Sequence, residues 1–179
     1  MKIVVLTGSP HRNGTSALLA DRFIAGALES GNTVFRFDAA FEELHPCLGC
    51  DKCGYGSSLC VFRDAMDGLN PELLEADMVV FISPLYYFGL SAQLKMVIDR
   101  FYANDIRLNG HKQSMLMVTA YNPRSWVMEG VKAHYATLLR YLNWKDAGQL
   151  FALGCNVRSQ IERSDYPQRA YEMGRALCP

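Results

Sequence analysis

Four cysteines in one short stretch have the most distinctive spacing in this chain. Cys47, Cys50, Cys53 and Cys60 form the pattern C-x2-C-x2-C-x6-C. A compact triplet at this spacing can place three thiolates around one corner of a cubane cluster, and a fourth thiolate arrives from a few residues further on, as in the ferredoxin pattern. These four cysteines are therefore candidate ligands of a [4Fe-4S] cluster.

Structural or redox-active thiols are an equally supported role for the same four cysteines. A zinc site is less favoured, because zinc more usually takes two C-x2-C pairs that are separated by a longer stretch. Disulfides are disfavoured, because we expect the chain in the reducing cytosol. The remaining cysteines, Cys155 and Cys178, have no partners in the sequence, so we expect them to be ordinary buried or surface thiols.

A loop rich in glycine and hydroxyl residues is the second candidate site. It follows the apolar run 2–6, which is typical of a buried parallel strand, and it extends from Gly8 to Ser16. A helix that begins near Thr15 would direct its free N–H groups and the positive end of its dipole at a phosphate. The loop has neither G-x-x-x-x-G-K-[ST] nor G-x-G-x-x-G. An ordinary strand-to-helix connection with a good N-cap is the alternative.

Three consecutive aromatic residues form the third candidate site. The run 78–82 is the most apolar of the chain and predicts a central strand, and Tyr86, Tyr87 and Phe88 lie in the segment that leaves its carboxyl end. Ligands of open α/β sheets bind outside the carboxyl ends of such strands. A planar aromatic phosphate would suit this place, and packing in a core or interface is the alternative role of the aromatic residues.

The elements that must position these loops alternate between strand and helix along the chain. Hydrophobic spacing predicts strands at 2–6, 33–37, 78–82, 115–119 and 149–153, and helices at 15–29, 71–76, 91–102, 125–142 and 165–177. Residues 39–63 have no sustained period and predict a long functional loop. The pattern favours an α/β fold, a flavodoxin-like three-layer sandwich with a five-stranded parallel sheet of order 2-1-3-4-5. This order brings the loops after the first, third and fourth strands together.

Composition limits the classes of partner. The chain of 179 residues is long enough for one domain, which we expect to cover 1–179. Its 18 basic and 18 acidic residues cancel, so we expect no nucleic acid and no anionic membrane as partner. No apolar segment approaches the roughly 18 residues of a membrane span, and the first apolar run is too short for a signal sequence. We therefore expect a cytoplasmic protein.

Several motifs in a fixed order carry a family resemblance. They are Gly8-Ser9-Pro10 followed by Asn13-Gly14-Thr15, the cysteine loop ending in Asp64-Ala65-Met66, the segment Ser83-Pro84-Leu85-Tyr86-Tyr87, and Leu94-Lys95 through Asp99-Arg100. Over about residues 1–122 the chain resembles the NAD(P)H-dependent FMN reductase and iron-sulfur flavoprotein family of flavodoxin-like oxidoreductases. The resemblance implies that bound FMN takes hydride from NAD(P)H and reduces a quinone, a flavin or another small-molecule acceptor, with no side-chain acid or base required.

The resemblance also implies which residues bind FMN. The residues implied for the phosphate are Ser9, His11, Arg12, Asn13, Gly14, Thr15 and Ser16. The residues implied for the isoalloxazine are Pro84, Leu85, Tyr86, Tyr87, Phe88 and Gly89, and Tyr121 is added to the cofactor-binding set. Family members commonly form dimers, so a homodimer or homotetramer is expected, in which Arg100, Tyr121 and Trp126 are candidates for a neighbouring subunit's site.

Two other functions remain open. In this family the compact cysteine motif marks iron-sulfur flavoproteins, which would make the chain an electron-transfer module with a [4Fe-4S] cluster and a ferredoxin partner, although similar loops occur in relatives that bind flavin alone. A flavin-free binding or regulatory protein of the same fold is the other alternative. Asp64 and Asp67 are expected to begin a helix, not to act as an acid pair. The histidines His45, His111 and His134 lack metal-type spacing.

Overall fold

A single parallel sheet forms the centre of the computed structural model, which describes residues 1–178. Its strands are β1 (Lys2–Thr7), β2 (Thr33–Asp38), β3 (Met78–Pro84), β4 (Gln113–Thr119) and β5 (Lys145–Ala152). All neighbouring strands are parallel and the order is β2-β1-β3-β4-β5. The predicted flavodoxin-like sheet of order 2-1-3-4-5 is therefore confirmed.

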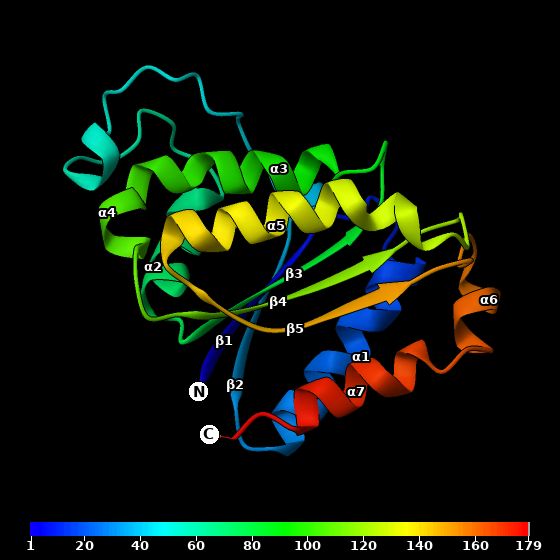
Figure 1. The fold of residues 1–179 in the computed structure, drawn as a ribbon. Coiled ribbons are helices and arrows are strands. Elements are labelled where there is room, and N and C mark those ends of the chain that lie inside the picture. Colours follow the sequence, from blue (N-terminus) through cyan, green and yellow to red (C-terminus); the bar gives the residue numbers. More distant parts are fainter. Residues whose placement is uncertain (179) are drawn as a thin grey trace.

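Helices cover both faces of this sheet and complete the three layers (Figure 1). One face carries α2 (Met66–Glu75), α3 (Ala92–Asp99) and α5 (Glu129–Leu142), and the other carries α1 (Thr15–Glu29), α6 (Arg158–Glu162) and α7 (Tyr166–Arg175). Because side chains of a strand alternate between faces, Val4 and Leu6 belong to the first core, whereas Ile3 and Val5 belong to the second. This burial on both faces explains the continuous apolar strands.

The predicted boundaries differ from the structure at several places. Helix α2 begins at Met66, and Pro71 lies inside it instead of at its first position. The carboxylate of Asp64 accepts a hydrogen bond from the Met66 amide at 3.0 Å, which explains the earlier start. Strand β5 begins at Lys145, before the predicted 149. Its first four residues, Lys145-Asp146-Ala147-Gly148, are exposed or half-exposed at a sheet edge. These edge residues lack the apolar pattern of a buried strand.

Short elements were not predicted. They are the helix α4 (Asp105–Leu108), the helix α6 and the 3₁₀ turns η1 (Ala39–Phe41) and η2 (Gly54–Gly56). The predicted helices 91–102 and 125–142 are each divided into an α-helix and a 3₁₀ turn, η3 (Arg100–Asn104) after α3 and η4 (Ser125–Met128) before α5. The cysteine segment 42–65 is irregular except for η2 and lies beside α4 and the carboxyl end of α3 (Figure 1). Among the described residues, no helix combines the length and the apolar composition that crossing a bilayer requires.

Candidate functional site

The carboxyl ends of the strands open into a cavity of about 670 Å³, which we call the sheet-edge cavity. Its wall comes from the loops after β1, β3, β4 and β5. Ten of the residues predicted for FMN line it: Ser9, His11, Arg12, Asn13, Gly14, Thr15, Pro84, Leu85, Tyr86 and Tyr121. The cavity has the size of an ordinary small-molecule site, and its wall is continuous from the phosphate loop to the aromatic loop.

The first turn of α1 supplies the polar end of this cavity. Gly14 occupies the N-cap position, and within the described chain no side chain caps the helix. The loop before it is fixed from within, because the His11 amide donates to Ser9 Oγ at 3.2 Å and the Gly14 amide donates to the His11 carbonyl at 3.0 Å. The first amides of a 15-residue helix are thus left for a ligand, and the helix dipole favours an anion there.

The charged side chains in the wall of the sheet-edge cavity are positive, as an anion-binding site requires. Arg12 and Arg158 line the cavity together with His11, and among the described wall residues there is no carboxylate. The guanidinium carbon of Arg12 lies 3.8 Å from the centre of the Phe41 ring, a cation–π contact that holds this arginine in place. The cavity therefore favours a phosphate group at this end.

Two hydroxyls that we expected to face the phosphate bind another side chain. Thr15 Oγ1 donates to Thr119 Oγ1 at 3.0 Å, and Ser16 Oγ lies 2.9 Å from the same atom. These contacts tie the first turn of α1 to the end of β4. Thr119 also lines the cavity, so it is a site residue that the sequence reasoning missed. Its position at the carboxyl end of a predicted strand was the available signal.

The aromatic loop is a tight turn with unusual backbone angles. Tyr86 and Gly89 exchange two backbone hydrogen bonds of 3.1 Å, and Leu85 donates its amide to the Thr119 carbonyl at 2.8 Å. Tyr87 and Phe88 have φ angles of 44° and 66°, as in a type I′ turn, where Gly and Asn are the usual residues. Two aromatic residues in the left-handed region are strained, and such strain concentrates at functional sites.

The tip of this turn borders a second, smaller cavity. Tyr87 and Phe88 line a space of about 280 Å³. Leu85 and Tyr121 belong to the walls of both cavities. Phe88 stacks on Trp126 with ring centres 5.5 Å apart. Of the predicted FMN residues, all of which the structure describes, Ser16 and Gly89 line neither cavity.

The loop after β5 also contributes to the sheet-edge cavity and was missed. Cys155, Asn156, Val157 and Arg158 line its wall. Cys155 is buried and donates its amide to the Ala120 carbonyl at 2.8 Å, and burial raises the pKa of its thiol. It therefore fills the wall as a neutral thiol, in agreement with the prediction of an ordinary buried cysteine. The position of this loop after the last strand was the only sequence signal.

All four clustered cysteines line one further cavity of about 240 Å³, which we call the cysteine cavity. Its wall also contains Phe62, Arg100 and Tyr102, and all six cysteines of the chain are free thiols. Within residues 1–178, no three cysteine, histidine or carboxylate side chains are arranged to hold a metal ion. The wall residues from η3 lie at the opposite end of α3 from the aromatic loop (Figure 1).

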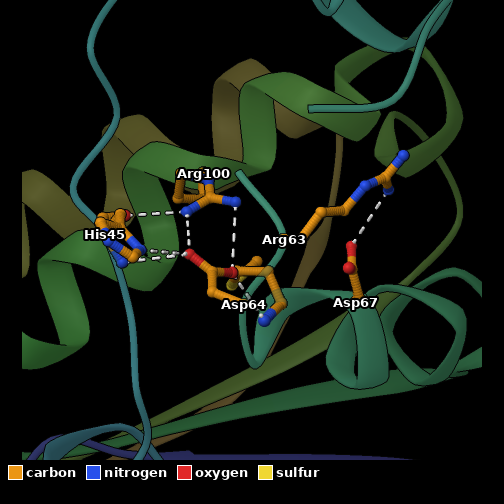
Figure 2. A network of polar contacts seen from close by, with 6 residues as sticks. His45, Arg63, Asp64, Asp67 and Arg100 are labelled. Carbon is orange, nitrogen blue, oxygen red and sulfur yellow. Dashed lines mark hydrogen bonds and ion pairs between the residues drawn. The ribbon is translucent and has the colours of Figure 1, made fainter. Parts of the chain in front are cut away.

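A buried ion pair supports the cysteine cavity. Figure 2 shows Arg100, whose Nη1 lies 2.7 Å from Asp64 Oδ2 and 2.8 Å from the His45 carbonyl oxygen. The exposed fractions of the two paired side chains are only 2% and 1%. Groups of its own chain thus bind Arg100, and its role in a neighbouring subunit's site stays a prediction. Asp64 begins α2 as expected and in addition binds this arginine.

The pair changes the pKa of both partners. Burial alone raises the pKa of Asp64, but hydrogen bonds from Arg100 and from the His45 and Met66 amides outweigh it, so the pKa is lowered. Burial alone lowers the pKa of Arg100, but Asp64 outweighs it and the pKa is raised. Both groups are therefore held in their charged forms. Asp67 makes only an exposed contact of 3.6 Å with Arg63 (Figure 2).

Comparison with known proteins decides the family. A model of the NADPH-dependent FMN reductase family matches residues 1–155. The chain belongs to this family. An iron-sulfur flavoprotein of Methanocaldococcus jannaschii is 36% identical over 100 residues, which are 56% of this chain and 51% of that protein. A putative NAD(P)H-dependent FMN-containing oxidoreductase of Bacillus subtilis is 26% identical over 124 residues, 68% of this chain and 64% of that protein.

Two solved structures share the fold. The NAD(P)H:quinone oxidoreductase of Methanothermobacter marburgensis superposes with a TM-score of 0.73 at 19% identity, over 97% of this chain and 94% of that chain. RosB, solved with a bound flavin phosphate intermediate, gives 0.75 at 15% identity, over 97% and 76%. The chain spans about half the length of the relatives matched by sequence, 51% of the Methanocaldococcus jannaschii protein and 55% of an iron-sulfur flavoprotein of Archaeoglobus fulgidus. In this FMN reductase family member, residues Asn156 and Arg158 of the cavity wall lie beyond the family match.

Proposed function

We propose that this chain binds FMN in the sheet-edge cavity and acts as an NAD(P)H-dependent oxidoreductase with a quinone, a flavin or another small molecule as electron acceptor. The observation that carries the proposal is one continuous wall that joins an uncapped helix N-terminus and two arginines to an aromatic loop. Bound FMN would supply the hydride chemistry at its N5 atom. The residues of the chain hold and orient it.

At the phosphate end, the amides of the first turn of α1 and the side chains of His11 and Arg12 suit a dianion. The hydroxyls of Thr15 and Ser16 contribute indirectly, since both bind Thr119 and thereby fix the position of these amides. A buried set of oriented N–H groups binds phosphate without needing a lysine. This accounts for a phosphate site that has no Walker lysine.

At the ring end, the backbone N–H groups after Pro84 are candidate donors to the flavin. The amides of Leu85 and Tyr86 are already bonded, to Thr119 and Gly89 respectively. We therefore assign the remaining donors to the turn itself, at Tyr87 and Phe88, which line the smaller cavity that shares the wall residues Leu85 and Tyr121 with the sheet-edge cavity. The aromatic side chain of Tyr86 lines the cavity and is 43% exposed, which suits stacking against a planar ring.

Titration of the flavin-free protein with FMN tests this assignment. We expect FMN fluorescence to be quenched on binding, and Arg12→Gln to weaken the affinity about tenfold through loss of a charge-assisted contact. Arg140→Gln is the matched control, because Arg140 is exposed on α5 and far from the cavity in the fold. A colourless protein that ignores added FMN would instead support the flavin-free alternative.

A second candidate function rests on the cysteine cavity. We propose that Cys47, Cys50, Cys53 and Cys60 ligate a [4Fe-4S] cluster and that the chain exchanges single electrons with a ferredoxin. The support is that the four thiols line one cavity together. Thiolates around a cubane bind four different iron atoms, so they stand further apart than the ligands of a single ion. The missing single-ion arrangement among the described residues is therefore compatible with a cluster.

The position of the cysteine cavity favours an assembly of several copies. It lies one length of α3 from the aromatic loop, and eight helical residues span roughly 12 Å. A second copy of the chain would shorten this path by presenting its own sheet-edge cavity. We accordingly propose a homodimer or homotetramer, which the molar mass in solution tests.

Iron and sulfide analysis of anaerobically purified protein tests the cluster. We expect iron and sulfide in the wild type and in Cys178→Ser, since Cys178 lies outside the cysteine cavity. Cys50→Ser should lose most of both. Equal iron content in these two variants would contradict the assignment. If the wild type contains FMN but no iron, only the flavin-dependent function remains supported.

A further inference from the structure

One side chain in the wall of the cysteine cavity is a fully buried cation with an unused donor. Arg100 has an exposed fraction of 2% and lines this cavity. Its two terminal nitrogens bind Asp64 and the His45 carbonyl, whereas its Nε–H has no hydrogen-bond partner. Among the described residues, the only other buried side-chain N or O atom without a partner is the acceptor Gln93 Oε1. A buried N–H without a partner is costly, so its retention indicates an interaction that a ligand completes.

The guanidinium of Arg100 is fixed in orientation. Asp64 binds both terminal nitrogens, at 2.7 and 3.3 Å. The guanidinium also lies over the Phe62 ring, 5.3 Å from its centre, and this ring stacks on His45 at 4.5 Å with an interplanar angle of 9°. An arginine that is held on two sides cannot turn to satisfy its Nε–H elsewhere. The donor therefore stays where the fold places it.

Of the four clustered thiols, Cys60 is the candidate acceptor for this N–H donor. Both residues line the cysteine cavity. Cys60 also lies two residues before Phe62, and the Arg100 guanidinium sits over the Phe62 ring at 5.3 Å. No complete hydrogen bond joins the two in this structure, because Arg100 Nε remains without a partner.

We propose that Arg100 is a positioning residue that donates its free N–H to the sulfur of Cys60 when this sulfur ligates a [4Fe-4S] cluster, and that it thereby raises the reduction potential of the cluster. The inference rests on the second function proposed above. Four thiolates and an added electron make the reduced cluster the more negative form. A buried cation and an N–H···S hydrogen bond stabilise that form more than the oxidised one.

The test compares variants that leave no unpaired charge in the buried site. Arg100→Gln alone would leave Asp64 charged and unpaired in the core, so the double variant Asp64→Asn/Arg100→Gln removes both charges together. Arg100→Lys keeps the positive charge and removes the Nε–H. Arg63→Gln is the matched control, since it removes one positive charge from an exposed position on the same loop.

The readout is the midpoint potential of the cluster, followed by electron paramagnetic resonance during a redox titration of the reconstituted protein. The flavin potential in the same sample is the internal reference. We expect the double variant to shift the cluster potential downward by about 59 mV, a tenfold change in a one-electron equilibrium, with the flavin potential unchanged. Arg100→Lys should shift it less, and Arg63→Gln hardly at all, because solvent screens an exposed charge.

The outcomes separate two failures. If the wild type binds no iron under anaerobic reconstitution, the cluster function is wrong and this inference is wrong with it. A wild type that holds a cluster whose potential is the same in Arg100→Lys and in the double variant overturns only the role of Arg100. If the double variant fails to fold, the comparison of Arg100→Lys with Arg63→Gln decides, and equal potentials in these two overturn the proposal.

Discussion

The hydroxyl of Ser91 donates a hydrogen bond of 2.7 Å to the carbonyl oxygen of Gly8, and this contact joins the two loops of the sheet-edge cavity across 83 residues of sequence. Ser91 is fully buried and also caps α3, because its Oγ accepts from the Leu94 amide. A Cβ atom on Gly8 would lie 2.2 Å from Ser91 Oγ. Gly8 is therefore required for this close approach, and the spacing of the phosphate and aromatic loops depends on it.

Gly8→Ala is expected to separate these loops. The new methyl group would meet Ser91 Oγ at 2.2 Å and Leu94 Cβ at 2.7 Å, so we expect a loss of about 1–3 kcal/mol in the free energy of unfolding together with weaker FMN binding. Urea denaturation and FMN titration measure the two effects. Gly68→Ala is the control, because nothing lies within 4 Å of its added methyl group and helix propensity favours alanine. Unchanged FMN affinity in Gly8→Ala would refute the spacing argument.

Tyr87→Asn is expected to stabilise the protein. Tyr87 has a φ angle of 44° and a fully exposed side chain, and Asn adopts the left-handed region at lower cost. We expect a gain of about 0.5–1 kcal/mol in thermal or urea unfolding. Phe88→Asn should gain less, because it also loses the stacking on Trp126. If Tyr87→Asn destabilises the fold, the turn is not strained at this residue.

Asp64 makes stability depend on pH in the acid range. Because its pKa in the folded protein is lowered, the unfolded chain binds its proton first, so the contribution of Asp64 is present above the ordinary carboxyl pKa of about 3.9 and is lost as pH falls through the lower folded value. We expect Asp64→Asn to lose about 3–5 kcal/mol at pH 7, since it leaves Arg100 buried without its partner. The measurement is urea unfolding at pH 7 and near pH 3.

The difference in stability between the wild type and Asp64→Asn should shrink at the lower pH. Asp67→Asn is the control, because the contact of Asp67 with Arg63 is exposed and 3.6 Å long, and such pairs contribute roughly 0–1 kcal/mol. A difference between wild type and Asp64→Asn that stays constant from pH 7 to pH 3 would show that the charge of Asp64 is not the source of its effect.

The sheet could be predicted from the sequence because each of its buried strands is marked by a pattern within its own few residues. The apolar runs of β1 and β3 identify strands that are buried on both faces, and alternation with helices leaves few topologies. The position of the phosphate and aromatic loops follows from this topology alone. Strand β5 was placed too late in the chain, because its polar first half lies at the edge of the sheet and carries no such pattern.

The rest of the site depends on contacts that no local pattern encodes. Asp64 and Arg100 are 36 residues apart, and Thr15 and Thr119 are 104 residues apart. Spacing along one element says nothing about a partner on another, so the roles of Arg100 and Thr119 emerged only in three dimensions. The strain at Tyr87 was equally hidden, since Tyr-Phe is not a sequence that favours a left-handed turn.

Thr119 provides the sharpest test of how the phosphate end is organised. Its hydroxyl contacts those of Thr15 and Ser16 at 3.0 and 2.9 Å, and Ser16 is buried. Thr119→Val keeps the volume and removes the shared partner, so we expect a loss of about 1–3 kcal/mol in unfolding free energy and weaker FMN binding, because the first turn of α1 is no longer tied to β4. Thr119→Ser keeps the hydroxyl and should bind FMN like the wild type. If both variants weaken FMN binding equally, the methyl group of Thr119 and not its hydroxyl fixes the site.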